Sequence, residues 1–166
     1  ELGEKLRGKF FQSTLLFPHL LSWVVTSYLV YALLGATNGF VNNTILAGMG
    51  KEGIDWYSVK MYWPLILIIV YIWKNAGYTA IVYMAGIAGI DKEIFEAARI
   101  DGASKIKQII SITLPMLRPT VIIMTLMSIG RIFYSDFGLF YQVPMNSGML
   151  FSVTQTIDTY VYRGLM

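Results

Sequence analysis

Three long apolar stretches constrain the fold of this chain more than any other feature. They cover residues 15–34, 63–90 and 114–133. The hydrocarbon core of a bilayer needs about 20 helical residues to cross it, and each stretch reaches that length. The sequence therefore predicts an all-α membrane protein, in which residues 1–166 form a single, partial transmembrane domain with about three membrane-spanning helices.

The composition indicates that lipid is the main solvent of the chain. Hydrophobic residues (AVILMFWYC) make up 55% of it and charged residues only 14%, whereas an average soluble domain is about one quarter charged. A net charge of +3 argues against a nucleic-acid partner and against a disordered chain. The chain has no cysteine and one histidine, His19. We therefore expect no metal site, no cofactor and no catalytic residues.

The distribution of basic residues predicts the orientation in the membrane. Segments 1–12 and 91–118 together contain eight lysines and arginines, whereas segment 35–62 and the tail after Arg131 contain three. By the positive-inside rule, the N-terminus and the 91–118 segment are cytoplasmic. Segment 35–62 and the tail then face the outside of a multi-pass protein of the cell membrane.

The cytoplasmic loop over residues 91–113 has the signals of two short helices at a bend. Asp91 is suited to cap the first helix, and Gly102 can end it in a left-handed conformation. Ser104 can cap the second helix. Periodicity alone is also consistent with a surface amphipathic helix that only organises the loop.

A longer pattern around this loop resembles a known family. It consists of Glu96-Ala97-Ala98, Asp101-Gly102-Ala103, Ile112-Thr113-Leu114-Pro115 and Pro119. The pattern resembles the EAA loop of binding-protein-dependent ABC importer permeases. Segments that resemble the carbohydrate-type subfamily are Phe17-Pro18-His19, Trp56-Tyr57, Ile72-Trp73-Lys74 and Asp136-Phe137-Gly138-Leu139-Phe140-Tyr141. The segment Ile157-Asp158-Thr159-Tyr160-Val161-Tyr162-Arg163 is similar to permeases for complex or polymeric sugars.

The resemblance implies a type I ABC importer permease-like helical bundle, of which this chain supplies three inner spans, so we expect a longer, bacterial polypeptide. It also implies four kinds of partner: cytoplasmic ABC ATPase subunits, a second and different permease subunit, an extracytoplasmic solute-binding protein, and an oligo- or polysaccharide substrate. The chain has no G-x-x-x-x-G-K-[ST] loop, so we expect a transport subunit that does not itself hydrolyse ATP.

By the same resemblance, one group of residues couples the permease to the ATPase. The group consists of Glu96, Ala97, Ala98, Asp101, Gly102, Ala103, Leu114 and Pro115. Glu96 would pair with a basic or polar group of the ATPase. Gly102 would supply a turn that a Cβ atom would strain.

A second group consists of polar residues within or next to the apolar stretches, which are candidates for the substrate pathway: Lys74, Asn75, Tyr78, Ser128 and Arg131. Lys74 lies about twelve residues into the second stretch, close to mid-membrane. Two interpretations of Lys74 remain equally open. It lines a polar pathway, or it is a structural partner for one of the expected further helices outside this chain or a side chain that snorkels to the interface.

An ATP-independent secondary transporter or channel for a polar solute is the alternative function. It would also use Lys74 and Arg131, but it leaves the pattern around residues 91–119 unexplained. A membrane-embedded enzyme is disfavoured because no acidic residue lies inside any of the three apolar stretches.

Overall fold

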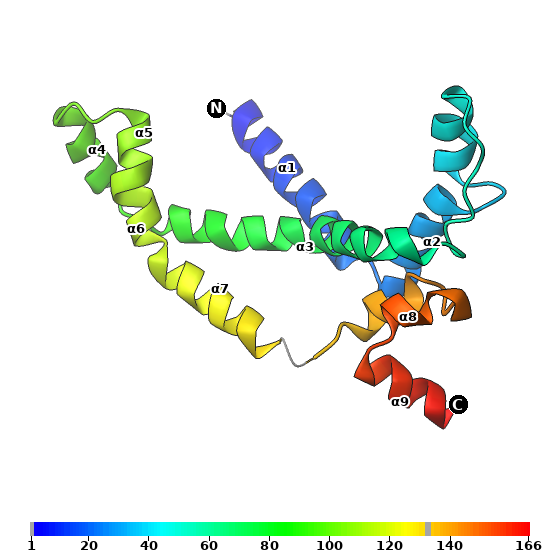
Figure 1. The fold of residues 1–166 in the computed structure, drawn as a ribbon. Coiled ribbons are helices and arrows are strands. Elements are labelled where there is room, and N and C mark those ends of the chain that lie inside the picture. The colour runs from blue at the N-terminus through cyan, green and yellow to red at the C-terminus, as the bar shows by residue number, and fades with distance from the viewer. Residues whose placement is uncertain (1, 132–133) are drawn as a thin grey trace. The chain divides into compact units, whose positions relative to one another are not determined.

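The computed structural model describes residues 2–131 and 134–166, and every regular element in those residues is a helix (Figure 1). The chain divides into two compact units. The first unit comprises Glu1–Leu16 and Ala76–Phe133, and the second comprises Phe17–Asn75 and Tyr134–Met166. Two helices contribute to both units: α1 (Leu2–Leu20) and α3 (Trp63–Ala88).

The first unit contains the 91–113 loop, which is expected on the cytoplasmic side, and the helix that follows it. Its remaining elements are α4 (Lys92–Ile100), α5 (Lys105–Gln108), the π-helix η3 (Ile109–Thr113), α6 (Leu114–Met116) and α7 (Arg118–Gly130). Within this unit α1 crosses α3 at Gly77, where a Cβ atom would lie only 1.7 Å from the carbonyl oxygen of Leu15. The crossing therefore requires a glycine, as is common where membrane helices approach closely.

The second unit contains the segments expected on the outer side. Its remaining elements are α2 (Trp23–Leu34), η1 (Val41–Leu46), η2 (Lys60–Tyr62), η4 (Gly138–Gln142), η5 (Gly148–Leu150), α8 (Phe151–Thr154) and α9 (Ile157–Leu165). Its apolar core consists of Val30, Trp63, Leu67, Val70, Leu139, Val143 and Leu150. Trp63 is fully buried and donates its indole N–H to the carbonyl of Trp56 at 2.7 Å.

The buried side chain of Asn42 organises the first outer segment. Its amide nitrogen donates to the carbonyls of Ala36 at 3.0 Å and Ile54 at 2.8 Å. Its oxygen accepts the backbone N–H of Ile54 at 3.2 Å and the indole N–H of Trp56 at 2.9 Å. One amide side chain thus satisfies backbone groups on both sides of a loop that has little regular hydrogen bonding of its own.

Tyr57 connects this segment to the tail of the second unit. Its hydroxyl donates to the carbonyl of Val143 at 3.4 Å, and its carbonyl accepts the hydroxyl of Ser147 at 3.1 Å. Its ring contacts those of Tyr31 and Trp63 with centroid separations of 5.5 and 5.0 Å. Burial raises the pKa of the Tyr57 hydroxyl well above its usual range, with a smaller contribution from the neighbouring Tyr31.

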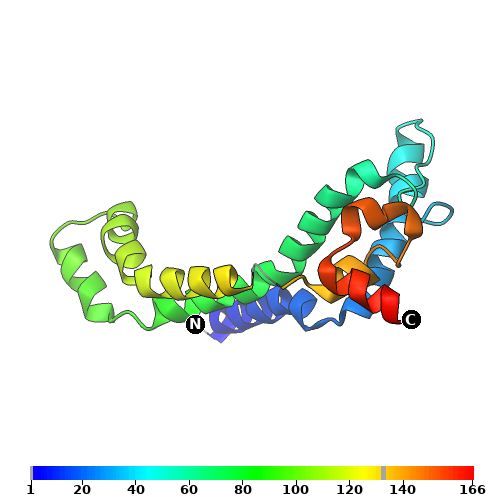
Figure 2. The same cartoon turned by 60° about the horizontal axis from the view of Figure 1, so that its bottom comes forward.

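The second apolar stretch forms the long helix α3, which is part of a continuous candidate span over Lys60–Ala88 (Figures 1 and 2). The first stretch differs from a simple span, because α1 and α2 are separate helices. Phe10–Leu20 and Trp23–Leu34 meet at a bend of 95°. Pro18 removes one helical N–H donor, and Ser22 caps α2 by accepting the N–H of Val25 at 3.2 Å. Hydropathy therefore predicted the apolar length of this stretch but not its break.

The third stretch is also interrupted, and its helices begin before residue 114. Lys105–Met116 and Arg118–Gly130 meet at 53°. The break falls at Leu117, between Pro115 in α6 and Pro119 in the first turn of α7, and neither proline has an N–H to donate to the carbonyl four residues earlier. The expected end of this span, over residues 132–133, lies outside the described residues.

Candidate functional site

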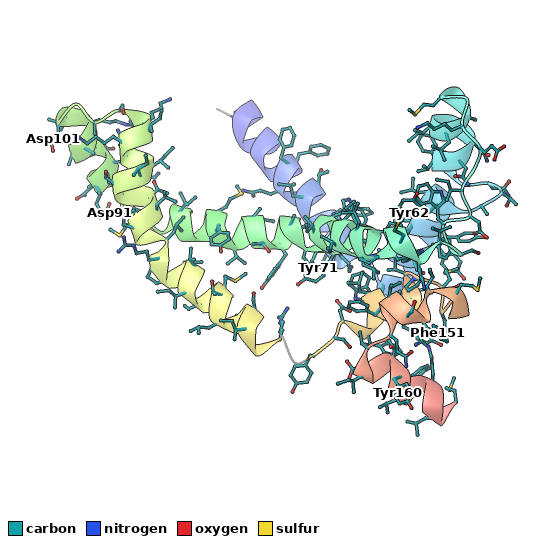
Figure 3. The ribbon with its side chains drawn as sticks, viewed as in Figure 1. Tyr62, Tyr71, Asp91, Asp101, Phe151 and Tyr160 are labelled. Atoms are coloured by element: carbon teal, nitrogen blue, oxygen red, sulfur yellow. The ribbon has the colours of Figure 1, made fainter. Side chains whose placement is uncertain are left out.

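The first helix of the 91–113 loop, α4, is fixed at its N-terminus by its own cap. The carboxylate of Asp91 accepts the N–H of Glu93 at 3.0 Å. Glu93 lies in the first turn of α4, where the helix dipole stabilises a negative charge. Figure 3 shows Asp91 and Asp101 at the two ends of α4. The predicted cap is therefore confirmed.

The C-terminus of α4 ends in a Schellman motif around Gly102. The N–H of Gly102 donates to the carbonyl of Arg99 at 3.0 Å, and the N–H of Ala103 donates to that of Ala98 at 2.9 Å. Gly102 has a φ of +75°, which confirms the predicted left-handed end. A Cβ built on Gly102 would meet no atom of the other described residues within 4 Å, its two neighbours in the chain aside. The need for glycine is therefore conformational and does not come from lack of space.

The second helix of the loop is fixed to the same turn. Ser104 accepts the N–H of Lys107 at 3.3 Å, which confirms its predicted role as a cap. The side-chain amide of Gln108 donates to the carbonyl of Ala103 at 2.9 Å, and Gln108 is 7% exposed. Local hydrogen bonds therefore define the bend between α4 and α5 from both sides.

The predicted coupling residues fall into two sets. Glu96, Ala97 and Asp101 are exposed on α4 and its C-terminal cap, and Ala98 and Ala103 are half-buried. Leu114 and Pro115 lie in α6, separated from the α4–α5 bend by α5 and η3. The structure therefore brings the residues from Glu96 to Ala103 together in one compact turn, and it places Leu114 and Pro115 on a different element.

Two further residues at the bend belong to the exposed surface, although the sequence analysis did not assign them to the site. Ile100 is 87% exposed at the end of α4, and Ile106 is 70% exposed near the start of α5. In the sequence Ile100 stands between Arg99 and Asp101. Single exposed apolar side chains are common on protein surfaces, so its position in the sequence did not by itself mark Ile100 as part of the site.

Lys74, the strongest of the pathway candidates, is a buried residue of the second unit. Its ammonium donates to the carbonyls of Pro18 and His19, each at 3.2 Å, and to that of Leu21. These contacts favour the structural interpretation of Lys74, but its partner is the C-terminus of α1 and the residue after it, and not a helix outside this chain.

The other pathway candidates belong to α3 and to the C-terminal end of α7. Asn75 donates to the carbonyl of Tyr71 at 2.9 Å, and Ser128 donates to that of Met124 at 2.8 Å, so both bond to their own helices. Tyr78 is 43% exposed, and Arg131 follows the last residue of α7. Asn75 belongs to the second unit, whereas Tyr78, Ser128 and Arg131 belong to the first. Among the described residues, no group of three or more His, Asp or Glu side chains is arranged to hold a metal ion.

The sequence is similar to known sugar permeases along nearly all of its length. It is 31% identical over 162 residues to the polygalacturonan/rhamnogalacturonan transport system permease protein YteP of Bacillus subtilis (strain 168), covering 98% of this chain and 50% of that protein. It is 32% identical over 161 residues to the lactose transport system permease protein LacF of Rhizobium radiobacter, covering 96% of this chain and 53% of that protein. The chain thus spans about half the length of the curated relatives it matches.

The fold also matches a solved transporter. The similarity is to a chain in the crystal structure of a bacterial alginate ABC transporter in complex with an alginate pentasaccharide-bound periplasmic protein. The TM-score is 0.85 and the identity 31%, over 97% of this chain and 55% of that chain. Residues 9–163 match the family described as binding-protein-dependent transport system inner membrane component. This chain belongs to that family of membrane transport components.

Proposed function

We propose that this chain is the part of a sugar permease subunit that couples an ATPase to the movement of the membrane helices. The whole protein would be an importer component that depends on an extracytoplasmic solute-binding protein. The observation that carries the proposal is the rigid α4–α5 bend, which combines the EAA pattern with an exposed surface.

The geometry of the bend suits the transmission of force. A loop that moved freely would absorb the motion of a docked ATPase, whereas this bend is fixed by the caps at Asp91 and Ser104 and by the turn at Gly102. Exposed Ile100 and Ile106 offer an apolar contact, and the carboxylate of Glu96 offers a charge for a basic group. Leu114 and Pro115 would lie outside the surface that contacts the ATPase and would act at the junction between the loop and α7.

Oligo- or polysaccharides are the proposed substrates. The relatives are named as permeases for polygalacturonan, lactose and arabinooligosaccharides, and the solved transporter carries alginate. Two permease subunits of different sequence would form the pathway, next to cytoplasmic ATPase subunits. Asn75, Tyr78, Ser128 and Arg131 would line parts of that pathway.

The test is purification of the full-length protein from native membranes in mild detergent, as wild type and as the Glu96→Lys and Gly102→Asp variants. The matched control is Glu52→Lys, the same charge reversal at an exposed residue of the first outer segment. We expect an ATPase and a second permease to accompany the wild type and the control, and the ATPase to be lost from both loop variants. Sugar uptake should fail in the loop variants at matched membrane levels.

Two results would contradict the proposal. The first is normal uptake by Glu96→Lys and Gly102→Asp at matched expression. The second is a wild-type protein that purifies alone and transports after reconstitution without ATP. The second result would establish the secondary transporter or channel instead, and the α4–α5 bend would then be a structural loop.

A further inference from the structure

The end of α1 is an unusual place in a membrane helix, because the chain turns sharply between Leu20 and Trp23. The last carbonyls of any helix have no intrahelical donor. In water they would bond to solvent, but within a bilayer each must find a donor in the protein. The break in the first span therefore needs a partner that supplies several hydrogen bonds at one point.

Lys74 supplies donors to two of the last carbonyls of α1 and to a third one in the break itself, and the carbonyl of Pro18 also accepts the N–H of Leu21 at 3.3 Å. An ammonium group has three N–H donors, and the Lys74 ammonium bonds to three carbonyls, those of Pro18, His19 and Leu21. Tyr71, labelled in Figure 3, marks the preceding turn of α3. At 6% exposure, Lys74 is enclosed by the second unit.

The same arrangement stabilises the positive charge. The carbonyl end of a helix carries partial negative charge, so the C-terminus of α1 is a favourable place for an ammonium. The ammonium also lies 5.0 Å from the centre of the Trp23 ring, within the range of a cation–π contact. The helix end and the indole ring thus act together with the negative charge of Asp136, which also attracts the ammonium.

Trp23 extends the contact from Lys74 to the outer tail. It is the first residue of α2, and a Cβ atom on Gly138 would lie 2.0 Å from its ring. Gly138 is also the first residue of η4, whose Leu139 packs in the core with Val30 of α2. Lys74 and η4 therefore contact the same indole and together define where α2 begins.

We propose that Lys74 is a positioning residue for transport and does not contact the sugar. Its ammonium keeps α1 and α2 as two separate helices and fixes the start of α2 against η4. The three carbonyls use all of its donors, so none is left for a passing sugar hydroxyl. The part of this inference that concerns transport rests on the proposed function, whereas the part that concerns the helix break does not.

The test combines Lys74 variants with a thiol reporter in the full-length protein. The reporter is Ser27→Cys, a nearly isosteric change in α2 at a residue that is 1% exposed. This chain contains no cysteine, and any cysteine elsewhere in the protein is replaced by serine. Tyr28→Cys, at a residue that is 61% exposed, is the matched control for reagent access. Labelling uses a small, membrane-permeant maleimide.

Lys74→Met removes every donor at nearly the same length, Lys74→Arg retains a cation with donors, and Lys74→Gln retains a neutral donor. We expect labelling of the Ser27→Cys reporter to become at least about tenfold faster in Lys74→Met, because local opening exposes buried thiols. In Lys74→Arg the labelling rate of the reporter should stay within about threefold of the rate with Lys74 intact. The rate in Lys74→Gln should lie between those of the other two variants. Labelling of the Tyr28→Cys control should not change.

Uptake provides the second measurement. Uptake should decrease most in Lys74→Met, less in Lys74→Gln and least in Lys74→Arg. The ATPase should still accompany each variant, and the ratio of uptake between two sugars should not change. Unchanged labelling of the Ser27→Cys reporter in Lys74→Met would overturn the inference, as would a shifted sugar preference in Lys74→Arg or Lys74→Gln. If Lys74→Met does not assemble, the labelling rate of the Ser27→Cys reporter in Lys74→Gln is used to test the inference instead. If wild-type uptake proves independent of ATP, the proposed function fails, but the labelling result still tests the helix break.

Discussion

Replacing Gly77 by alanine tests the crossing of α1 and α3 in the first unit. The added Cβ would lie 1.7 Å from the carbonyl oxygen of Leu15 and 2.5 Å from its carbonyl carbon. Ordinary contacts of a Cβ begin at 3.4 Å, so the oxygen would have to move away by about 1.7 Å. Both obstructing atoms belong to the backbone, so no side-chain rotation can relieve the clash.

The magnitude follows from two opposing effects. Overpacking of a close contact costs about 1–3 kcal/mol, and a rigid backbone obstacle places Gly77→Ala at the upper end. Alanine in a helix interior is better than glycine by about 1 kcal/mol. The net loss of stability is therefore about 2 kcal/mol, which would lower the Tm of a domain of this size by about 4–8 °C and that of the longer full-length protein by less.

The assay is thermal unfolding of the purified full-length protein in detergent, with Gly89→Ala as the control. At Gly89 the nearest atoms to a Cβ are 3.5 and 3.7 Å away, which is ordinary contact. The control should change stability by less than about 0.5 kcal/mol. Leu15→Ala should not rescue Gly77→Ala, because it leaves the obstructing carbonyl in place. An unchanged Tm for Gly77→Ala, or rescue by Leu15→Ala, would refute the backbone contact.

Three further predictions concern the loops. Asn42→Ala leaves two carbonyls and two N–H groups without their partner and should destabilise the first outer segment by about 2–3 kcal/mol; trypsin cleavage at the exposed Lys51 should then be faster than in the wild type. Asp91→Ala removes the α4 cap at a cost of about 1 kcal/mol and should increase hydrogen exchange at the Glu93 amide, whereas Asp91→Asn should not. Burial raises the pKa of Tyr57 above its ordinary 10.0, so the stability that its neutral hydroxyl contributes is complete below pH 10 and decreases as the pH rises further. Absorbance titration should therefore show one tyrosine, absent in Tyr57→Phe, that ionises only when the protein unfolds.

Local chemistry explains why the cytoplasmic loop could be predicted in detail. Asp91, Gly102 and Ser104 act on atoms within five residues of themselves, so the caps and the left-handed turn are determined by nearby sequence. Hydropathy similarly predicted α3, because the need to span a bilayer depends on the length of an apolar run. These signals do not require knowledge of which segments lie side by side.

The sequence by itself determined which segments are apolar enough for the membrane, where the capped cytoplasmic bend lies and which family pattern it carries. Only the tertiary structure decided that the first apolar stretch breaks between Leu20 and Trp23, that Lys74 bonds to carbonyls at that break, and that Gly77 is a crossing point. The reason is physical. A lysine in an apolar helix satisfies whichever acceptors the fold brings to it, and those of Lys74 lie more than fifty residues away in the chain.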